Sequence, residues 1–150
     1  MECEKQKLSV LIITLNEEQH IKSLLEDIDF ADEIIVVDSY SADKTADIAA
    51  SFQNVKLIQN PFIDYTSQRN FALDQAKNHW VLFIDADEKL TPELKSEIST
   101  EINSENAASA YFIYRIFMFK ASRLNFSGWQ TDKIFRLFNK SKCRYNEERT

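Results

Sequence analysis

LSVLIIT, residues 8–14, is a continuous, largely apolar run that is rich in β-branched residues. A run of this kind is typical of a strand that is buried on both faces, as strands are in a parallel sheet. The same character recurs in EIIVVD at residues 33–38 and WVLFI at residues 80–84, and VKLIQ at residues 55–59 is a further candidate. The sequence therefore predicts four strands of one sheet.

Helical patterns alternate with these strands. Asn16, with Gln19 three residues later, forms a capping-box pattern ahead of apolar residues at helical spacing. Thr91-Pro92-Glu93 supplies an N-cap, a proline at N1 and an acidic first turn. The remaining patterns are a short one through Ile48, Ala49 and Phe52 and a longer one over residues 66–77. Such alternation implies a mainly parallel sheet flanked by helices, with ligands at the carboxyl ends of the strands.

The pattern changes after about residue 108. Two aromatic-rich runs follow, Ala110–Phe119 and Lys133–Asn139, without a helical pattern between them. Such runs predict a mixed or antiparallel extension of the sheet. Because 150 residues is the size of one domain, we expect a single α/β domain.

Composition argues against several classes of function. The net charge of -6 makes nucleic acid an unexpected partner, because phosphate backbones are bound by clustered Lys and Arg. Cys3 and Cys143 have no CxxC or Cys/His spacing around them, so we expect reduced thiols and no zinc site. Residues 1–7 lack the apolar stretch of a signal peptide, and Tyr111–Phe119 is shorter than the roughly 20 residues of a membrane span. We therefore expect a cytoplasmic protein without a transmembrane segment.

Two aspartates at the end of the fourth strand indicate a metal–diphosphate site. Asp85 and Asp87 flank one small residue, so in extended geometry their carboxylates point to the same side. They repel each other unless a cation compensates, and Mg²⁺ or Mn²⁺ commonly binds one or two carboxylates plus phosphate oxygens. The single glycine, Gly128, excludes a glycine-rich phosphate loop, which leaves side chains and a metal to hold phosphate. The other interpretation of this DxD motif is an ordinary acidic turn.

Four further positions have two interpretations each. Asp38 ends the second strand on the same rim, where it either bonds a base or ribose hydroxyl or caps the turn before Ser39. Asn16 and Glu17 are otherwise explained as a helix cap and a first-turn acid. Arg69 lies in the helix before the fourth strand and either contacts phosphate and base or is an exposed helix residue.

Together, four segments resemble the family 2 glycosyltransferases and their GT-A fold. They are LSVLIITLNEE (8–18), EIIVVDSYSADKT (33–45), SQRNFAL (67–73) and VLFIDADE (81–88). The segments Trp129–Asp132 and Ile134–Phe138 are similar to a bacterial subgroup linked to lipopolysaccharide core assembly. The resemblance implies transfer of a sugar from a nucleoside diphosphate sugar, usually a UDP-sugar, to a glycan or lipid-linked acceptor.

The resemblance also implies a role for each matching residue. Leu15-Asn16-Glu17 would lie beside the nucleoside, Asp38 would bond the base, and Arg69 would border the base and the diphosphate. Asp85 would approach the ribose, and Asp87 would contact Mn²⁺ or Mg²⁺, with Asp85 as the second candidate for the metal.

The chain departs from the family pattern at the end of its first strand. It reads Ile13-Thr14-Leu15-Asn16, whereas many members read Pro-Thr-Tyr-Asn. The aromatic ring that would stack on the base is therefore missing at this position.

Asp132 is the predicted general base. Relatives with this fold often invert the anomeric centre, which requires a carboxylate to take the proton of the acceptor hydroxyl. A metal holds the charge of the DxD pair, so a separate acid has to come from the later part of the chain. Asp132 follows Trp129, which can pack on a sugar face, and directly precedes the strand Lys133–Asn139. The alternatives are that Asp132 is an ordinary loop aspartate before a strand and that Glu147, Glu148 or a residue beyond Thr150 is the base.

Family members continue beyond this point with acceptor-side structure, so we expect an N-terminal portion of a longer chain. Residues 1–108 would bind the nucleotide sugar, and residues 109–150 would begin the acceptor side. Two other functions remain open. One is a haloacid-dehalogenase-like phosphotransferase with Asp85 as nucleophile and Asp87 as acid/base, and the other is a non-catalytic nucleotide-binding fragment. The aromatic run Tyr111–Phe119 is either a buried strand or a point of peripheral membrane contact.

Overall fold

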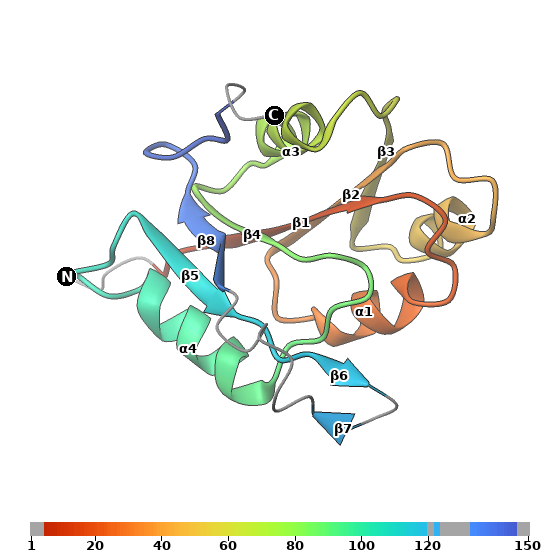
Figure 1. Cartoon of the computed structure of the whole chain (residues 1–150). Helices are drawn as coiled ribbons and strands as arrows, with labels where there is room; N and C mark the ends of the chain where they lie inside the picture. Colours follow the sequence, from red (N-terminus) through yellow and green to blue (C-terminus); the bar gives the residue numbers. More distant parts are fainter. Residues whose placement is uncertain (1–4, 120–121, 124–132, 147–150) are drawn as a thin grey trace.

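The computed structural model of the chain describes residues 5–119, 122–123 and 133–146 (Figure 1). Within these residues the strands are β1 (Leu8–Thr14), β2 (Glu33–Asp38), β3 (Val55–Gln59), β4 (Trp80–Phe83), β5 (Ala110–Tyr114), β6 (Met118–Phe119), β7 (Ser122–Arg123) and β8 (Lys133–Asn139). The helices are α1 (Ile21–Asp27), α2 (Thr45–Ala50), α3 (Tyr65–Gln75) and α4 (Pro92–Ile102). The predicted first four strands and β8 are confirmed, with β4 one residue shorter than expected.

Six strands form one sheet in the order β3-β2-β1-β4-β8-β5. β3, β2, β1 and β4 run parallel, whereas β8 is antiparallel to both of its neighbours, β4 and β5. Helices α1, α2 and α4 cover one face of the sheet, and α3 covers the other (Figure 1). This is the predicted α/β architecture, a mainly parallel sheet with an antiparallel extension. In the described part of the chain, no helix is both long and apolar enough to cross a bilayer.

β1 lies inside the sheet and is paired on both edges. It pairs with β2 as far as Thr14 opposite Asp38, and its first half pairs with β4. Successive side chains of a strand point to opposite faces. Ile12 therefore packs in the core beneath α1, α2 and α4, while Leu11 packs in the core beneath α3. Both are fully buried, which explains why this run shows no polar alternation.

The predicted capping box at the start of the first helix is wrong. Asn16 has a φ of 56°, and its side-chain oxygen accepts a hydrogen bond from the Ala42 amide at 2.8 Å. α1 begins only at Ile21, and its N-cap residue makes no side-chain hydrogen bond. Asn tolerates the left-handed region of backbone conformation better than most residues. Asn16 therefore forms a turn after β1, and its side chain contacts the loop after β2 at Ala42. The N-cap predicted at Thr91 is confirmed, since its hydroxyl accepts from the Leu94 amide.

The aromatic strand expected over residues 110–119 is divided. β5 ends at Tyr114, opposite Lys133, the first residue of its partner β8, and Met118–Phe119 pairs instead with the short strand β7. Within the described residues, β8 begins at Lys133, and its pairing with β5 extends no further than this residue. β5 is an edge strand, and its side chains are not uniformly buried: Phe112 is 45% exposed and Tyr114 is 66% exposed.

Replacing Leu82 with Ala should destabilise the fold strongly. Leu82 is fully buried in β4, between β1 and β8, so the substitution leaves a cavity and should lower the free energy of unfolding by about 2–5 kcal/mol. The control is Ile116→Ala, because Ile116 is 54% exposed and lies outside the strands; its effect should be within about 0.5 kcal/mol. Urea denaturation measures both, and equal losses would contradict this view of the core.

Candidate functional site

A pocket of about 620 Å³ opens where β1, β2 and β4 end. From the end of β1 and the loop after it, the lining residues are Ile13, Thr14, Leu15 and Glu17; from the loops after β2 and β4 they are Ser39, Asp85, Ala86 and Asp87; from α3 and the loop before it they are Phe62, Tyr65, Gln68 and Arg69. This arrangement follows from the parallel pairing, which brings the carboxyl ends of three strands to one rim. Of the predicted site residues, Leu15, Glu17, Arg69, Asp85 and Asp87 line this pocket, whereas Asn16 and Asp38 do not.

Asp38 lies beneath the rim and caps a turn. It is fully buried, one carboxylate oxygen accepts from the Ser41 amide at 2.9 Å, and the other accepts from the Ser41 hydroxyl. A buried carboxylate is tolerated where its oxygens are hydrogen-bonded in this way. The turn-capping interpretation of Asp38 therefore describes its contacts in the structure, and contact with a base stays a prediction.

Two loops at the rim are tied together by hydrogen bonds, and we call this arrangement the loop clasp. It joins residues 16–18 after β1 to residues 41–45 after β2. Its bonds are Asn16 amide to Ser41 hydroxyl (2.8 Å), Ala42 amide to Asn16 side chain (2.8 Å), Glu17 amide to Thr45 hydroxyl (2.7 Å), Glu18 amide to Asp43 carboxylate (3.1 Å) and Lys44 amide to Glu18 carboxylate (3.1 Å). Asn16 thus acts within the clasp, and its neighbours Leu15 and Glu17 are held against the pocket.

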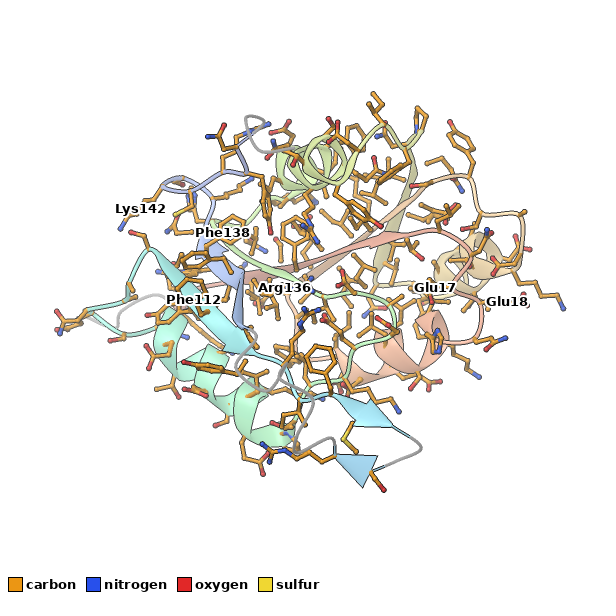
Figure 2. The ribbon with its side chains drawn as sticks, viewed as in Figure 1. Glu17, Glu18, Phe112, Arg136, Phe138 and Lys142 are labelled. Atoms are coloured by element: carbon orange, nitrogen blue, oxygen red, sulfur yellow. The ribbon has the colours of Figure 1, made fainter. Side chains whose placement is uncertain are left out.

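Asp85 is bound by an arginine from the antiparallel part of the sheet. Arg136 of β8 donates to both carboxylate oxygens of Asp85, at 3.1 and 2.6 Å, and also to Glu88 at 3.0 Å. Its side chain is only 6% exposed, and Figure 2 labels it near the middle of the view. Glu88 also contacts Asp85, because the other oxygen of its carboxylate accepts a hydrogen bond from the Asp85 amide at 2.9 Å.

This pairing sets the electrostatics of the DxD motif. Burial opposes ionisation of Asp85, but the hydrogen bonds and charge of Arg136, helped by the charges of Arg69 and Arg115, outweigh it and lower the pKa of Asp85. For Glu88, burial dominates and raises its pKa. The cation that the sequence argument required beside Asp85 is therefore, in this structure, a guanidinium. Asp87 is exposed on the pocket.

Arg69 lies between two aromatic rings on another wall of the pocket. Its guanidinium carbon is 5.8 Å from the centre of the Tyr65 ring and 5.4 Å from that of Tyr145, both within the range of cation–π attraction. Within the part of the chain that the structure describes, the Nε atom of Arg69 and the hydroxyl oxygen of Thr14 are buried without a hydrogen-bond partner. Buried polar atoms are nearly always hydrogen-bonded, so these two atoms are exceptions beside the pocket.

The predicted general base, Asp132, lies outside the described residues, as does Trp129. Among the described residues, no group of three or more His, Cys, Asp and Glu side chains is arranged to hold a metal ion. Sequence reasoning did not assign Arg136 or Phe62 to the site. For Arg136 a signal was present, because it is the charged residue within the otherwise apolar run IFRLF.

The chain is similar to known glycosyltransferases. The model of the family described as "Glycosyl transferase family 2" matches residues 9–147. A glycosyltransferase of Rickettsia bellii is 38% identical over 144 residues, which are 95% of this chain and 47% of that protein. The lipopolysaccharide core biosynthesis glycosyltransferase LpsC of Rhizobium meliloti is 37% identical over 95 residues, covering 61% of this chain and 35% of that protein.

A solved structure is similar as well. The crystal structure of S. aureus TarS 1-349 in complex with UDP-GlcNAc matches 65% of this chain and 31% of that chain, with 31% identity and a TM-score of 0.58. The chain spans about half the length of the Rickettsia relative, as the 47% coverage states.

Replacing Ser41 with Ala should weaken the loop clasp. The Ser41 hydroxyl donates to Asp38 and accepts from the Asn16 amide, so its loss leaves a buried carboxylate oxygen and an amide with fewer partners. We expect the free energy of unfolding to fall by about 1–3 kcal/mol. Ser51→Ala is the matched control, because the Ser51 hydroxyl is exposed and donates only within its own helix end. Equal values for the two variants in urea denaturation would show that the clasp does not contribute.

Proposed function

Because the chain belongs to glycosyl transferase family 2, we propose that it binds the donor for transfer of a sugar from a nucleoside diphosphate sugar. The observation that carries this proposal is the pocket at the rim of β1, β2 and β4, where Asp85, Asp87 and Arg69 converge. A UDP-sugar is the proposed donor, since TarS, 31% identical to this chain over the matched part, was crystallised with UDP-GlcNAc.

The proposed donor contacts follow from the pocket walls. Leu15 and Glu17 would lie beside the nucleoside, with the loop clasp fixing them through Asn16. Arg69 would donate to the base and diphosphate, because it lines the pocket and a guanidinium suits phosphate oxygens. Asp85 would accept from a ribose hydroxyl, since each carboxylate oxygen keeps a second lone pair beside its bond to Arg136.

Asp38 is proposed to act on the base. Both of its oxygens accept from Ser41, so a direct contact would use their remaining lone pairs or replace one of these bonds. Ser39, the next residue in the chain, lines the pocket, so Asp38 would also act on the base indirectly by fixing the position of Ser39.

A divalent metal, Mn²⁺ or Mg²⁺, fits the site if the donor supplies part of its ligands. Asp87 is exposed on the pocket and is the proposed protein ligand, with Asp85 as the second candidate, although Asp85 is already engaged by Arg136. These ions commonly bind with one or two carboxylates plus phosphate oxygens. When bound, the ion neutralises the charge of the leaving diphosphate.

The proposed general base is Asp132, and the proposed reaction inverts the anomeric centre. Asp132 lies four positions before Arg136, a stretch of chain that covers at most about 14 Å when fully extended. Because Arg136 contacts Asp85 directly, this connectivity supports a base close to the donor site. Glu147, Glu148 and residues later in a longer chain remain the alternatives.

A glycan or lipid-linked acceptor is proposed, with the protein acting in the cytoplasm at the inner face of the membrane. The name of LpsC, a lipopolysaccharide core biosynthesis glycosyltransferase, supports such an acceptor for a related protein. The exposed aromatic side chains of β5, Phe112 and Tyr114, support peripheral membrane contact on the proposed acceptor side, residues 109–150. The haloacid-dehalogenase-like alternative finds no support, because the family 2 match covers residues 9–147.

UDP binding should require a divalent metal. Asp87 and the diphosphate are both anionic, so without an ion between them their repulsion should weaken binding by about 10-fold or more. Calorimetry with UDP in Mn²⁺ and in EDTA measures this difference. Asp87→Asn should abolish the dependence on Mn²⁺. The control is Asp74→Asn, which removes an exposed carboxylate of α3 that is paired with Arg144 and should leave the dependence on Mn²⁺ unchanged. Equal UDP affinity in EDTA and in Mn²⁺ would remove the metal from the proposal.

Replacing Asp132 with Asn should separate catalysis from binding. In a form of the enzyme that transfers sugar, the variant should lose turnover by about 100-fold or more and keep its affinity for UDP, because a general base acts only in the transition state. Initial rates with a UDP-sugar and calorimetry with UDP provide the two readouts. Near-normal turnover would assign the base to Glu147, Glu148 or another acid.

A further inference from the structure

We propose that Arg136 is a positioning residue of the donor site, which fixes the Asp85 carboxylate and, through Glu88, the turn that carries Asp87. This inference rests on the proposed function, because Asp85 and Asp87 matter only if the pocket binds a nucleoside diphosphate. Arg136 itself is not among the residues that line the pocket. It would therefore act on the donor through its partners.

The geometry fixes the orientation of Asp85. Two guanidinium nitrogens of Arg136 reach the two carboxylate oxygens of Asp85 at 3.1 and 2.6 Å. A two-point contact with the planar fork of arginine prevents free rotation of the carboxylate, which a single contact to a lysine would allow. The 37% of the Asp85 side chain that stays exposed is thus presented to the pocket in one orientation.

Glu88 extends this control to the whole turn after β4. One Glu88 oxygen accepts from Arg136 at 3.0 Å, and the other accepts from the Asp85 amide at 2.9 Å. The Glu88 amide also donates to the Asp85 carbonyl at 3.0 Å. The two ends of the four-residue turn are thereby tied to each other and to Arg136. Asp87 lies between these ends, so the position of its backbone depends on the same contacts.

The burial of Arg136 favours a functional role over a purely stabilising one. Among the described residues, Arg136 is the only lysine or arginine that is buried. It is followed in β8 by the buried apolar residues Leu137 and Phe138. Burying an ion pair rarely stabilises a fold more than apolar residues of similar volume would. An apolar side chain at position 136 would serve the core as well, whereas it could not orient Asp85.

The test is a double-mutant cycle on UDP affinity in Mn²⁺. We expect Arg136→Met to weaken UDP binding by about 10- to 100-fold, because it removes hydrogen bonds to a charged group of the site. Arg136→Lys should lie between Arg136→Met and the wild type, since it keeps the charge and loses the fork. Asp85→Asn should weaken binding by a similar factor, and the double variant should bind no worse than Asp85→Asn, because Arg136 acts through Asp85.

Arg144→Met is the matched control. Arg144 makes the same two-point contact with Asp74, at 2.8 and 3.0 Å, on the exposed surface of α3. The Arg144→Met variant should bind UDP with the same affinity as the wild-type protein. Urea denaturation of each variant adds a readout of folding, since a merely structural Arg136 would lower stability and leave the UDP affinity of the folded protein unchanged.

Two results would overturn the inference and leave the proposed function intact. One is wild-type UDP affinity in Arg136→Met or, where that variant does not fold, in Arg136→Lys. The other is full additivity of the losses in the double variant, which would mean that Arg136 acts independently of Asp85. If the wild-type protein bound neither UDP nor a UDP-sugar in Mn²⁺, the proposed function would fail, and the inference would fail with it.

Discussion

β1 is hydrogen-bonded on both edges by parallel strands, and this double pairing is the constraint on which the site depends. Parallel neighbours end on the same side of a sheet, so the chain leaving β1, β2 and β4 must turn at one rim. The pairing is possible because apolar side chains such as Leu11 and Ile12 fill both faces of β1. The core thus decides where the polar residues of the loops converge.

Polar groups at the rim are stabilised by hydrogen-bond partners, one of which comes from a distant part of the chain. Asp38 is completely buried and relies on Ser41, while Asp85 relies on Arg136, which is 51 positions later in the sequence. Each burial would be unfavourable alone and is offset by hydrogen bonds of good geometry. Removing one member of such a pair therefore leaves the other buried without its hydrogen bonds.

The sequence predicted the strands well because their signal is local. The residues of β1, β2 and β3 begin and end where their apolar runs do, and the chemistry-bearing residues follow those ends. The capping box at Asn16 failed because its letters fit two structures, a helix cap and a cross-loop hydrogen bond, and the deciding partner Ala42 is 26 residues away. The counter-ion of Asp85 was missed for the same reason. Charge repulsion required a cation there, but no local pattern distinguishes a metal from a distant arginine.

The strand order has a consequence for how the chain assembles. β8 follows β5 in the sequence, yet it is inserted between β4 and β5. During synthesis, the parallel part can form from nearby segments, whereas β5 has no strand to pair with until β8 has emerged. Asp85 likewise waits for Arg136 to arrive with β8. The contacts of Asp85 are therefore complete only after β8 has been synthesised, and until then a nascent chain exposes the edge of β4 that β8 later covers.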